Sequence, residues 1–504
     1  MNNSFYRKTW SKLKKNINVS HISDLEHLSR QIAYSFLDYY LKDCYYEADY
    51  IDLLCEMTTF SSNPDLNSPG VQALFGIIIE SLCDDFEELQ TETYNRVITQ
   101  VISYCRNIPS GKDLDSNLKR FGMFTQQDLL DRINKIRNNS HSVIPQQKVK
   151  KILLLSRVTI GADIAITSVM LQKLALAFPE AEIVLIGEKK LQEIYGGNTF
   201  IKIKHVQYSR KGGLMERLYC WLHVLGAILE ETKNVPVENT ILVDPDSRLS
   251  QLGVMPLAEN NNYFFFDSRS VNALNNKMSM VQIANKWLDT ITGNIRFCYT
   301  KVWVRKLALK TAADLFDQIK KRGAKKIIVV NFGVGGNSRK KVGKHFEEKL
   351  LLTLLKEPDT VIFLDKGFGE EELDYTNALL NTVNKHGYDV SHAVFNSDNN
   401  KKIGHGVIGI ECKIGEIAAL IAKSDEFIGY DSACQHIAAA LNTPCLTIFA
   451  GSNNMRFIRR WSAYGRKSCQ IVHVDTLTNP SSIDADGIIT RILHVRDMRG
   501  QEQS

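Results

Sequence analysis

The residues best suited to chemistry lie near the C-terminus, in GEIAALIAKSDEFIGYDSACQHIAAALNTPCLTIFAG. An apolar strand runs into Asp431 and Ser432, which begin a helix that carries His436. Ser432 and His436 are four positions apart and share one helix face, while Asp431 and Ser432 suit hydrogen bonds to sugar hydroxyls. A single histidine is more often a satisfied core residue than a ligand, but its coupling to Asp431 and Ser432 favours a binding role. We therefore predict a polar ligand site at the end of this strand.

A second candidate is the glycine-rich loop in NFGVGGNSRKKVGKHF, which also follows a strand. Gly335 and Gly336 would let backbone amides approach a phosphate closely. The polar and cationic residues that follow would neutralise a diphosphate: Ser338, Arg339, Lys340 and Lys341. The loop lacks the G-x-x-x-x-G-K-[ST] spacing of a P-loop. The alternative is a solvated turn, but the coincidence of a helix start with several cations favours phosphate binding.

A third candidate is the loop SRVTIGADIAITS, after the first strand of the α/β region. Gly161 would allow a tight turn, and the following helix would offer its amide N–H groups to a ligand. Asp163 is placed where its carboxylate could face a cleft between two lobes. On spacing alone a helix-capping role for Asp163 is the better interpretation. The G-x-G-x-x-G fingerprint of dinucleotide-binding proteins is absent.

The elements that must position these residues alternate between strand and helix. Residues 147–310 and 311–504 each read as a series of short apolar strands separated by amphipathic helices, with KVWVRKLALKTAADLFDQIKKRGA as a helix between the two series. We predict an α/β fold in which two Rossmann-like doubly wound domains face a cleft. Ligands of such sheets bind beyond the carboxyl ends of the strands. Residues 1–146, called here the helical front, precede them as an all-helical domain.

Composition and charge narrow the function further. The 504 residues include 44% hydrophobic and 23% charged residues, which is typical of a globular protein. Residues 21–100 carry 3 basic and 15 acidic side chains, a net of −12, and residues 151–504 carry +8. A basic α/β region favours an anionic ligand such as a nucleotide. Its dispersed cations do not indicate nucleic acid.

The sequence also bears on location and partners. Ten cysteines without a CxxC pair indicate reduced thiols and a cytoplasmic protein. Neither a secretory signal nor an apolar run of ~20 residues is evident. We expect the helical front to recruit an acceptor or to form a homo-oligomer, and its six tyrosines between Tyr34 and Tyr50 to line a small core. Residues 1–16 are basic and aromatic, which suggests peripheral contact with the inner face of the membrane.

Residues ~150–480 resemble the heptosyltransferase family of GT-B glycosyltransferases. The resemblance rests on E-x-A-A-L-I-A-x-S-D-x-F-I-G-x-D-S-x-x-x-H-I-A-A-A-L-x-T-P, and on GADIAITSVML, which is similar to the family's Gly-Asp-x-x-x-x-T loop. It implies Asp163 as catalytic base and Thr167 as its helix threonine. The implied donor-binding residues are Gly335, Gly336, Ser338, Arg339, Lys340, Lys341, Gly367, Glu416, Asp431, Ser432 and His436. The implied acceptor-side residues are Gly161, Thr167, Asp244, Asp246 and Arg248.

The resemblance implies an inverting transfer without metal or cofactor, from a nucleotide-diphosphate sugar, with ADP-heptose as first choice, to a hydroxyl of a bacterial glycan or a protein. Asp244 and Asp246 have the spacing of a metal-binding pair but are read as structural or acceptor-facing. Two family glycines are Ala162 and Ala433 here, which points to an altered donor sugar or reduced activity. A nucleotide-sugar-binding scaffold and a nucleotide-sugar hydrolase or epimerase remain as alternatives.

Overall fold

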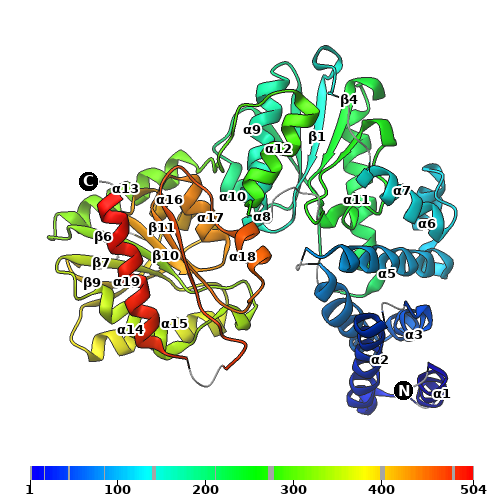
Figure 1. The fold of residues 1–504 in the computed structure, drawn as a ribbon, viewed down its shortest axis with the longest axis horizontal. Coiled ribbons are helices and arrows are strands. Elements are labelled where there is room, and N and C mark those ends of the chain that lie inside the picture. The colour runs from blue at the N-terminus through cyan, green and yellow to red at the C-terminus, as the bar shows by residue number, and fades with distance from the viewer. Residues whose placement is uncertain are drawn as a thin grey trace. The chain divides into compact units, whose positions relative to one another are not determined.

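The computed structural model describes residues 3–15, 17–43, 46–83, 86–138, 143–209, 212–270, 277–397, 403–479 and 483–502 (Figure 1). Tyr45 and three residues of the N-terminal basic segment, at positions 1, 2 and 16, lie outside this set. The chain forms two compact units. The first unit comprises Met1–Val158, Glu180–Glu188 and Lys202–Asn275, and the second comprises Thr159–Pro179, Lys189–Ile201 and Asn276–Ser504.

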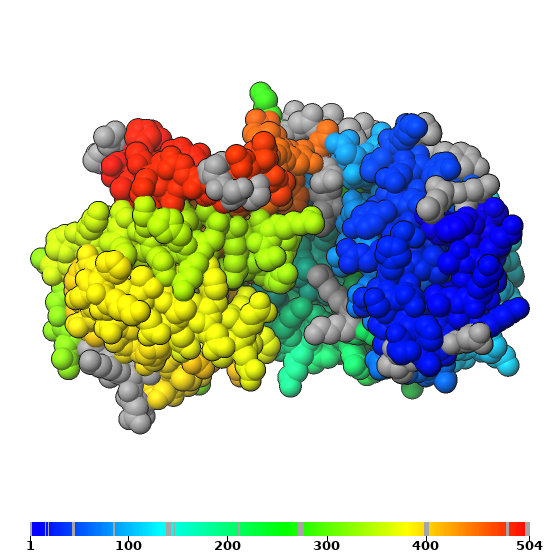
Figure 2. Space-filling view, turned by 90° about the horizontal axis from the view of Figure 1, so that it is seen from below, coloured from blue at the N-terminus to red at the C-terminus, as the bar shows by residue number. Residues whose placement is uncertain are grey.

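The described part of residues 1–146 forms helices, as predicted. Its helices are α1 (Asn3–Lys15), α2 (Ile22–Asp43), α3 (Ala48–Thr59), α4 (Pro64–Val71), α5 (Glu88–Asn107), α6 (Lys112–Arg120) and α7 (Gln126–Asn138), with the π-helical η2 (Gln72–Ile79) and the 3-10 turns η1 (Val19–His21), η3 (Glu80–Leu82), η4 (Pro109–Gly111) and η5 (Gln146–Lys148). Figure 2 shows its first helices as one contiguous blue surface. Tyr40 and Tyr50 are buried, while Tyr34 and Tyr39 are exposed.

The apolar face of helix α1 packs inside the protein. Tyr6 and Trp10 are each only 2% exposed and belong to the core of the first unit. Arg7 faces the acidic side chains of Asp49 and Glu56 at 3.9 and 3.6 Å. Two of the aromatic side chains that would insert into a membrane surface are therefore buried, whereas Phe5 is 47% exposed. The membrane contact expected from residues 1–16 stays a prediction.

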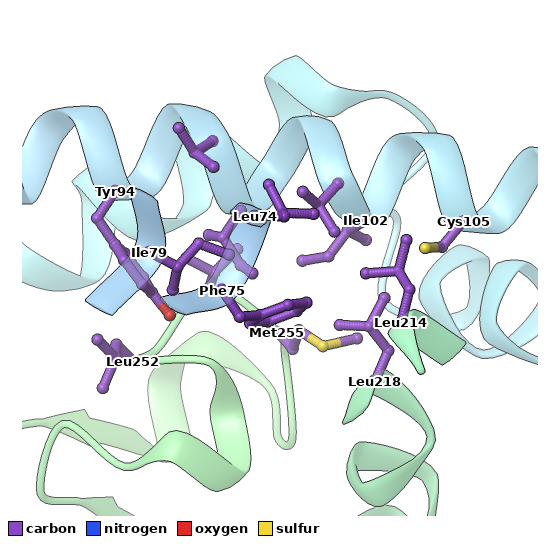
Figure 3. Packing of buried hydrophobic residues seen from close by; sticks show 14 of the residues in the cluster. Leu74, Phe75, Ile79, Tyr94, Ile102, Cys105, Leu214, Leu218, Leu252 and Met255 are labelled. Atoms are coloured by element: carbon purple, nitrogen blue, oxygen red, sulfur yellow. The ribbon is translucent and has the colours of Figure 1, made fainter. Parts of the chain in front are cut away.

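The helical front and the first sheet share one hydrophobic core (Figure 3). Side chains of η2 and α5 point toward α11 (Leu214–Thr232) and the loop after β4 (Thr240–Asp244). The labelled residues are Leu74, Phe75, Ile79, Tyr94, Ile102 and Cys105 on one side, and Leu214, Leu218, Leu252 and Met255 on the other. Arg132 of α7 donates to the carbonyl of Gly253 at 2.6 Å and lies over the ring of Tyr263 at 4.7 Å. The front is thus packed into the first unit rather than tethered to it.

The first sheet has five strands in the order β3-β2-β1-β4-β5, and the pairs β1–β2, β1–β4 and β4–β5 are parallel. The elements of this region are β1 (Lys151–Leu155), β2 (Glu182–Gly187), β3 (Ile201–His205), α11 (Leu214–Thr232), η7 (Val237–Asn239), β4 (Thr240–Asp244), η8 (Arg248–Ser250), η9 (Asn260–Asn262) and β5 (Tyr263–Phe265). The order reverses between β1 and β4, which is the switch point of a doubly wound sheet.

The second sheet has seven strands in the order β12-β11-β10-β6-β7-β9-β8, and its neighbouring strands pair in parallel. The strands are β6 (Lys326–Asn331), β7 (Thr360–Asp365), β8 (Val390–Val394), β9 (Gly406–Glu411), β10 (Glu426–Tyr430), β11 (Cys445–Phe449) and β12 (Cys469–His473). Its switch point lies between β6 and β10, whose carboxyl ends lead into two of the predicted site segments.

The helices of the second unit are α8 (Ile160–Ala162), the π-helical η6 (Asp163–Thr167), α9 (Ser168–Ala177), α10 (Leu191–Tyr195), α12 (Met280–Thr292), α13 (Lys306–Lys320), η10 (Ser338–Lys340), α14 (Lys344–Leu354), α15 (Glu370–Lys385), α16 (Ile414–Lys423), α17 (Ala433–Ala440), α18 (Met455–Trp461) and α19 (Ala485–Glu502). Helices α14, α15 and α19 cover one face of the second sheet. Helix α13 contributes to the other face, where Phe316 stacks on Phe363 at 5.3 Å.

Two sequence expectations about helices need correction or comment. The predicted helix at 301–324 begins only at Lys306, because Trp303 is extended and exchanges backbone hydrogen bonds with Ile194 and Gly197. The helical stretch Ile160–Ala177 is long and apolar enough to cross a membrane, by length and composition alone, but most of it is buried inside the protein. Burial of this kind is what a core helix of a folded domain shows.

Candidate functional site

The switch point of the second sheet brings two predicted segments together. The loop after β6 carries Lys340, and the loop after β10 carries Asp431. The Nζ atom of Lys340 lies 2.5 Å from Oδ2 of Asp431, and the Asp431 side chain is only 8% exposed. The strand order thus places a cation and a carboxylate where doubly wound sheets bind ligands.

Gln435 holds the other oxygen of Asp431, and sequence reasoning missed it. Its Nε2 atom donates to Oδ1 of Asp431 at 2.6 Å. Its Oε1 atom accepts hydrogen bonds from Thr447 Oγ1 at 3.2 Å and from the Ala463 amide at 3.3 Å. The side chain is fully buried. The sequence signal that could have identified Gln435 is its spacing of four positions from Asp431, because residues i and i+4 meet on one helix face.

His436 is buried on α17, at 3% exposure, and its ring lies 6.4 Å from that of Trp461. Burial, with a smaller contribution from the nearby Lys340 ammonium, lowers the pKa of His436 to about 4. The imidazole is therefore neutral at neutral pH. Its Nδ1 atom has no hydrogen-bond partner among the described residues, which is unusual for a buried polar atom. A polar ligand atom would satisfy it.

Asp163 lies inside a helix rather than at its start. Helix α8 begins at Ile160 with Thr159 as its N-cap, and the Asp163 amide donates to the Thr159 carbonyl at 2.8 Å. The capping interpretation is therefore wrong. Oδ1 of Asp163 accepts a hydrogen bond from Thr167 at 2.9 Å, and the Tyr195 hydroxyl donates to the Asp163 carbonyl at 2.7 Å. The π-helical segment η6 begins at Asp163 and ends at Thr167. A π-helical distortion of this kind is frequent at functional sites.

Gly161 lies inside helix α8 and not in the tight turn that we expected. It is helical, and a Cβ atom placed on it would lie 3.4 Å from the Ala433 Cα and 3.4 Å from the His436 Cδ2. Helix α8 and the π-helical segment pack on α17. The second unit by itself thus brings the helix of Asp163 against the helix that begins after Asp431 and Ser432 and carries His436.

The glycine-rich loop has a left-handed backbone at two of its glycines. Gly335 and Gly336 have φ angles of +62° and +88°, a conformation that glycine adopts readily. Ser338 and Arg339 are exposed. Lys341 lies over the ring of Tyr375 at 4.3 Å, whereas Lys340 points toward Asp431. Lys340 is therefore the cation placed beside the residues of α17, and it is our choice for the contact with a diphosphate.

Two further predicted donor residues lie at the carboxyl edge of the same sheet. Gly367 follows β7 with a φ of +76°, and its amide donates to Asp365 Oδ1 at 3.1 Å. Glu416 belongs to the first turn of α16, after β9. Its two oxygens accept from the Lys413 amide at 2.8 Å and the Asn396 side chain at 2.6 Å. Ser432 caps α17 through a 3.4 Å hydrogen bond from the Cys434 amide.

The predicted acceptor-side residues after β4 belong to the first unit, and the two aspartates are fully buried. Burial raises the pKa of Asp244 to about 6, and its side chain accepts hydrogen bonds from Ser250 and Tyr263. Asp246 pairs with Arg157 at 3.5 Å and with Arg269 at 3.1 Å. The structure gives both aspartates a structural role.

Arg248 is partly buried in η8. Within the described ranges, no group of three or more His, Cys, Asp or Glu side chains is arranged to hold a metal ion.

Comparison with known proteins gives matches to a family model, to a heptosyltransferase sequence and to solved structures. Residues 384–481 match the model of glycosyltransferase family 9 (heptosyltransferase). A segment of 47 residues, 9% of this chain, is 49% identical to lipopolysaccharide heptosyltransferase 3 of Escherichia coli and spans 14% of that protein. The chain matches a family 9 glycosyl transferase from Veillonella parvula DSM 2008 with a TM-score of 0.51 and 13% identity, over 72% of this chain and 100% of the other.

A further match is to E. coli heptosyltransferase WaaC with ADP, with a TM-score of 0.46 and 12% identity, over 68% of this chain and 99% of the other. Residues 384–481 contain Asp431, Ser432, Gln435 and His436, so the family match covers this part of the candidate site. The resemblance to the heptosyltransferases, inferred from the sequence motifs, is confirmed.

Proposed function

We propose that the protein is a glycosyltransferase that moves a sugar from a nucleotide-diphosphate donor, with ADP-heptose as first candidate, to a hydroxyl of a glycan or protein acceptor. The observation that carries the proposal is the packing of the Asp163 helix on α17, where Gly161 meets Ala433 and His436. This contact places the helix that carries the Asp163 carboxylate against the segment that matches family 9. Transfer needs the carboxylate and the donor-binding residues within reach of one sugar.

Asp163 is the proposed general base. It would take the proton from the acceptor hydroxyl as that oxygen attacks the anomeric carbon, and the bond from this carbon to the diphosphate would break. Attack from the face opposite the leaving group inverts the anomeric configuration. One carboxylate oxygen is held by Thr167, which fixes the orientation of the group.

The departing nucleotide diphosphate needs stabilisation, which in this proposal comes without a metal or cofactor. Lys340 lies beside Asp431 at the switch point, and the amides of Gly335 and Gly336 precede it in the same loop. Fixed donors and charges of this kind stabilise a developing negative charge. The N-terminus of α17 adds the positive end of its helix dipole. The neutral His436 offers its unpartnered Nδ1 to the sugar or a phosphate oxygen.

A thermal-shift panel of ADP, UDP, GDP and ADP-heptose tests the donor site. A ligand that binds only the folded protein stabilises it by about 2.7 kcal/mol at a hundredfold excess over Kd. We expect ADP and ADP-heptose to give the largest shifts. The absence of any nucleotide shift would contradict the proposal.

Product analysis with the best donor then separates the alternatives. A glycosylated acceptor supports transfer, free sugar indicates a hydrolase, and an altered nucleotide sugar indicates an epimerase. Binding without any product would indicate a scaffold in which Ala162 and Ala433 stand in place of the family glycines.

A further inference from the structure

Phe368 is the most exposed of the large hydrophobic side chains in the part of the chain that the structure describes. It is 95% exposed, in the loop between β7 and α15. Leaving an aromatic ring in water is unfavourable, so a ring held this openly suits a surface that is covered by something else. The loop belongs to the carboxyl edge of the second sheet, the edge that carries Lys340 and Asp431.

The backbone around Phe368 is fixed although its ring is open. The Gly367 amide donates to Asp365 Oδ1 at 3.1 Å, and the Phe368 amide donates to Glu372 Oε2 at 2.7 Å. Gly367 and Gly369 on either side have φ angles of +76° and +93°, which glycine adopts without strain. The loop thus presents the ring from a defined position.

This position is tied to the predicted phosphate loop. Asn331, the last residue of β6, donates to Asp365 Oδ2 at 2.6 Å, and Asp365 is the last residue of β7. The carboxylate that orients the Phe368 loop therefore also holds the end of the strand that leads to Gly335 and Lys340. Movement of one loop relative to the other would break this hydrogen bond.

The opposite side of the switch point is closed by the protein itself. After β11, a Cβ atom on Gly451 would lie 2.5 Å from the Arg339 carbonyl oxygen. Thr476 donates to the same carbonyl at 3.3 Å and accepts from the Gly451 amide at 3.0 Å. A nucleotide with its phosphates at Lys340 would therefore place its nucleoside on the β7 side.

The spacing of the strands allows this placement. In the order β10-β6-β7, two strand spacings of about 4.8 Å separate the Asp431 end from the Phe368 loop, roughly 10 Å in all. That is of the order of the separation between a nucleobase and its terminal phosphate. We propose that the ring of Phe368 stacks on the base of the bound nucleotide. This assignment rests on the proposed nucleotide-sugar site.

The test compares Phe368→Ala and Phe368→Trp with the wild-type chain, using ADP and inorganic pyrophosphate as probes in calorimetric titrations. Phe368→Ala should bind ADP roughly tenfold more weakly, the factor that about 1.4 kcal/mol produces, within the range known for base–aromatic stacking. Pyrophosphate, which has no base, should bind both proteins equally. Phe368→Trp should retain ADP affinity, and its fluorescence should be quenched by ADP but not by pyrophosphate.

Leu307→Ala is the matched control, because Leu307 is 76% exposed on α13 of the same unit. It should leave ADP affinity unchanged. Equal ADP affinity of Phe368→Ala and wild type would overturn the stacking role while leaving the proposed function intact. Failure of the wild-type chain to bind ADP would overturn both. A parallel loss of pyrophosphate binding in Phe368→Ala would show a structural effect and would also overturn the stacking role.

Discussion

Replacement of His436 by asparagine should make the protein less sensitive to acid. Burial, and to a lesser degree Lys340, lowers the pKa of His436 from its ordinary value of 6.5 to about 4. In the unfolded chain this histidine takes up a proton near pH 6.5, whereas in the folded protein it does so only near pH 4. Acid therefore favours the unfolded state. The stability contributed by the neutral ring is fully present above pH 6.5 and is lost as the pH falls to about 4.

The size of this effect follows from the same two values. An interval of about 2.5 in pH, at about 1.36 kcal/mol per pH unit, corresponds to about 3 kcal/mol. About 2 kcal/mol of this would already be lost between pH 7 and pH 4.5. Asparagine does not titrate in this range, so the variant lacks this pH-dependent contribution to the free energy of unfolding, whatever its stability at pH 7. The comparison concerns the slope of stability with pH and not its absolute value.

Urea unfolding at several values between pH 7 and pH 4.5 measures the slope, with histidine NMR to follow the ring directly. His223→Asn is the control, because His223 is exposed; it should keep the wild-type slope. A wild-type His436 resonance that titrates near pH 6.5, or identical slopes for His436→Asn and wild type, would refute the reasoning. ADP should raise the pKa of His436 if a phosphate approaches its Nδ1 atom.

Three further predictions concern the site and the core. Asp163→Asn should reduce transfer by at least a hundredfold, as expected for loss of a general base, with unchanged ADP affinity in calorimetry; unchanged turnover would remove Asp163 from that role. Lys340→Met should weaken ADP binding by about tenfold and reduce its salt dependence, whereas Lys349→Met, on the outer side of α14 where Lys349 pairs with Asp486 at 2.7 Å, should not. Leu74→Ala should cost about 2–5 kcal/mol in the unfolding of the first unit, and Leu41→Ala, 70% exposed, less than about 0.5 kcal/mol; similar costs would contradict the shared core.

The central strands could be predicted because they are continuous apolar runs that end in polar loops. The sequence predicts strands in ILLLS, AEIVLIGE, TILVDPDSRL, NYFFFDSR, KKIIVVNFGVGG, DTVIFLDKGFG, EFIGYDS and PCLTIFAG. In chain order these segments coincide with β1, β2, β4, β5, β6, β7, β10 and β11. Three of the four strands that were missed, β3, β8 and β12, are edge strands, with side chains of alternating or partial burial. An edge strand depends on one neighbour for its hydrogen bonds, so its own sequence specifies it weakly.

The grouping of three candidate site residues at the end of β10 was predictable for a similar reason. Asp431, Ser432 and His436 are close in the chain, and the strand before them is strongly apolar. Gln435 was not found, because its role depends on Thr447 and Ala463, which belong to later elements. Tyr195 was missed for the same reason, since it reaches Asp163 across 32 positions. Contacts at long sequence separation leave no local pattern.

The helical front shows that hydrophobic period and charge alone do not define a domain boundary. Its helical hydrophobic period and its acidic charge differ from those of residues 147–504, and this difference suggested a separate domain. Its apolar faces, however, contribute to the same core as α11 and the loop after β4. Arg132, 4% exposed, bonds the backbone of that loop. Because one core cannot be divided without exposing apolar surface, removal of the front should destabilise the first sheet as well as any function that the front itself has.

The two alanines that replace family glycines bear directly on whether the site is active. The close approach in this structure is made by Gly161, and the atoms nearest to a Cβ placed there are the Ala433 Cα at 3.4 Å, the His436 Cδ2 at 3.4 Å and the Ala433 amide nitrogen at 3.7 Å. The Ala433 methyl group is therefore no nearer than that nitrogen. A Cβ atom at residue 161 would make ordinary van der Waals contacts at these distances, and the Ala433 methyl group is not among the three atoms nearest to it.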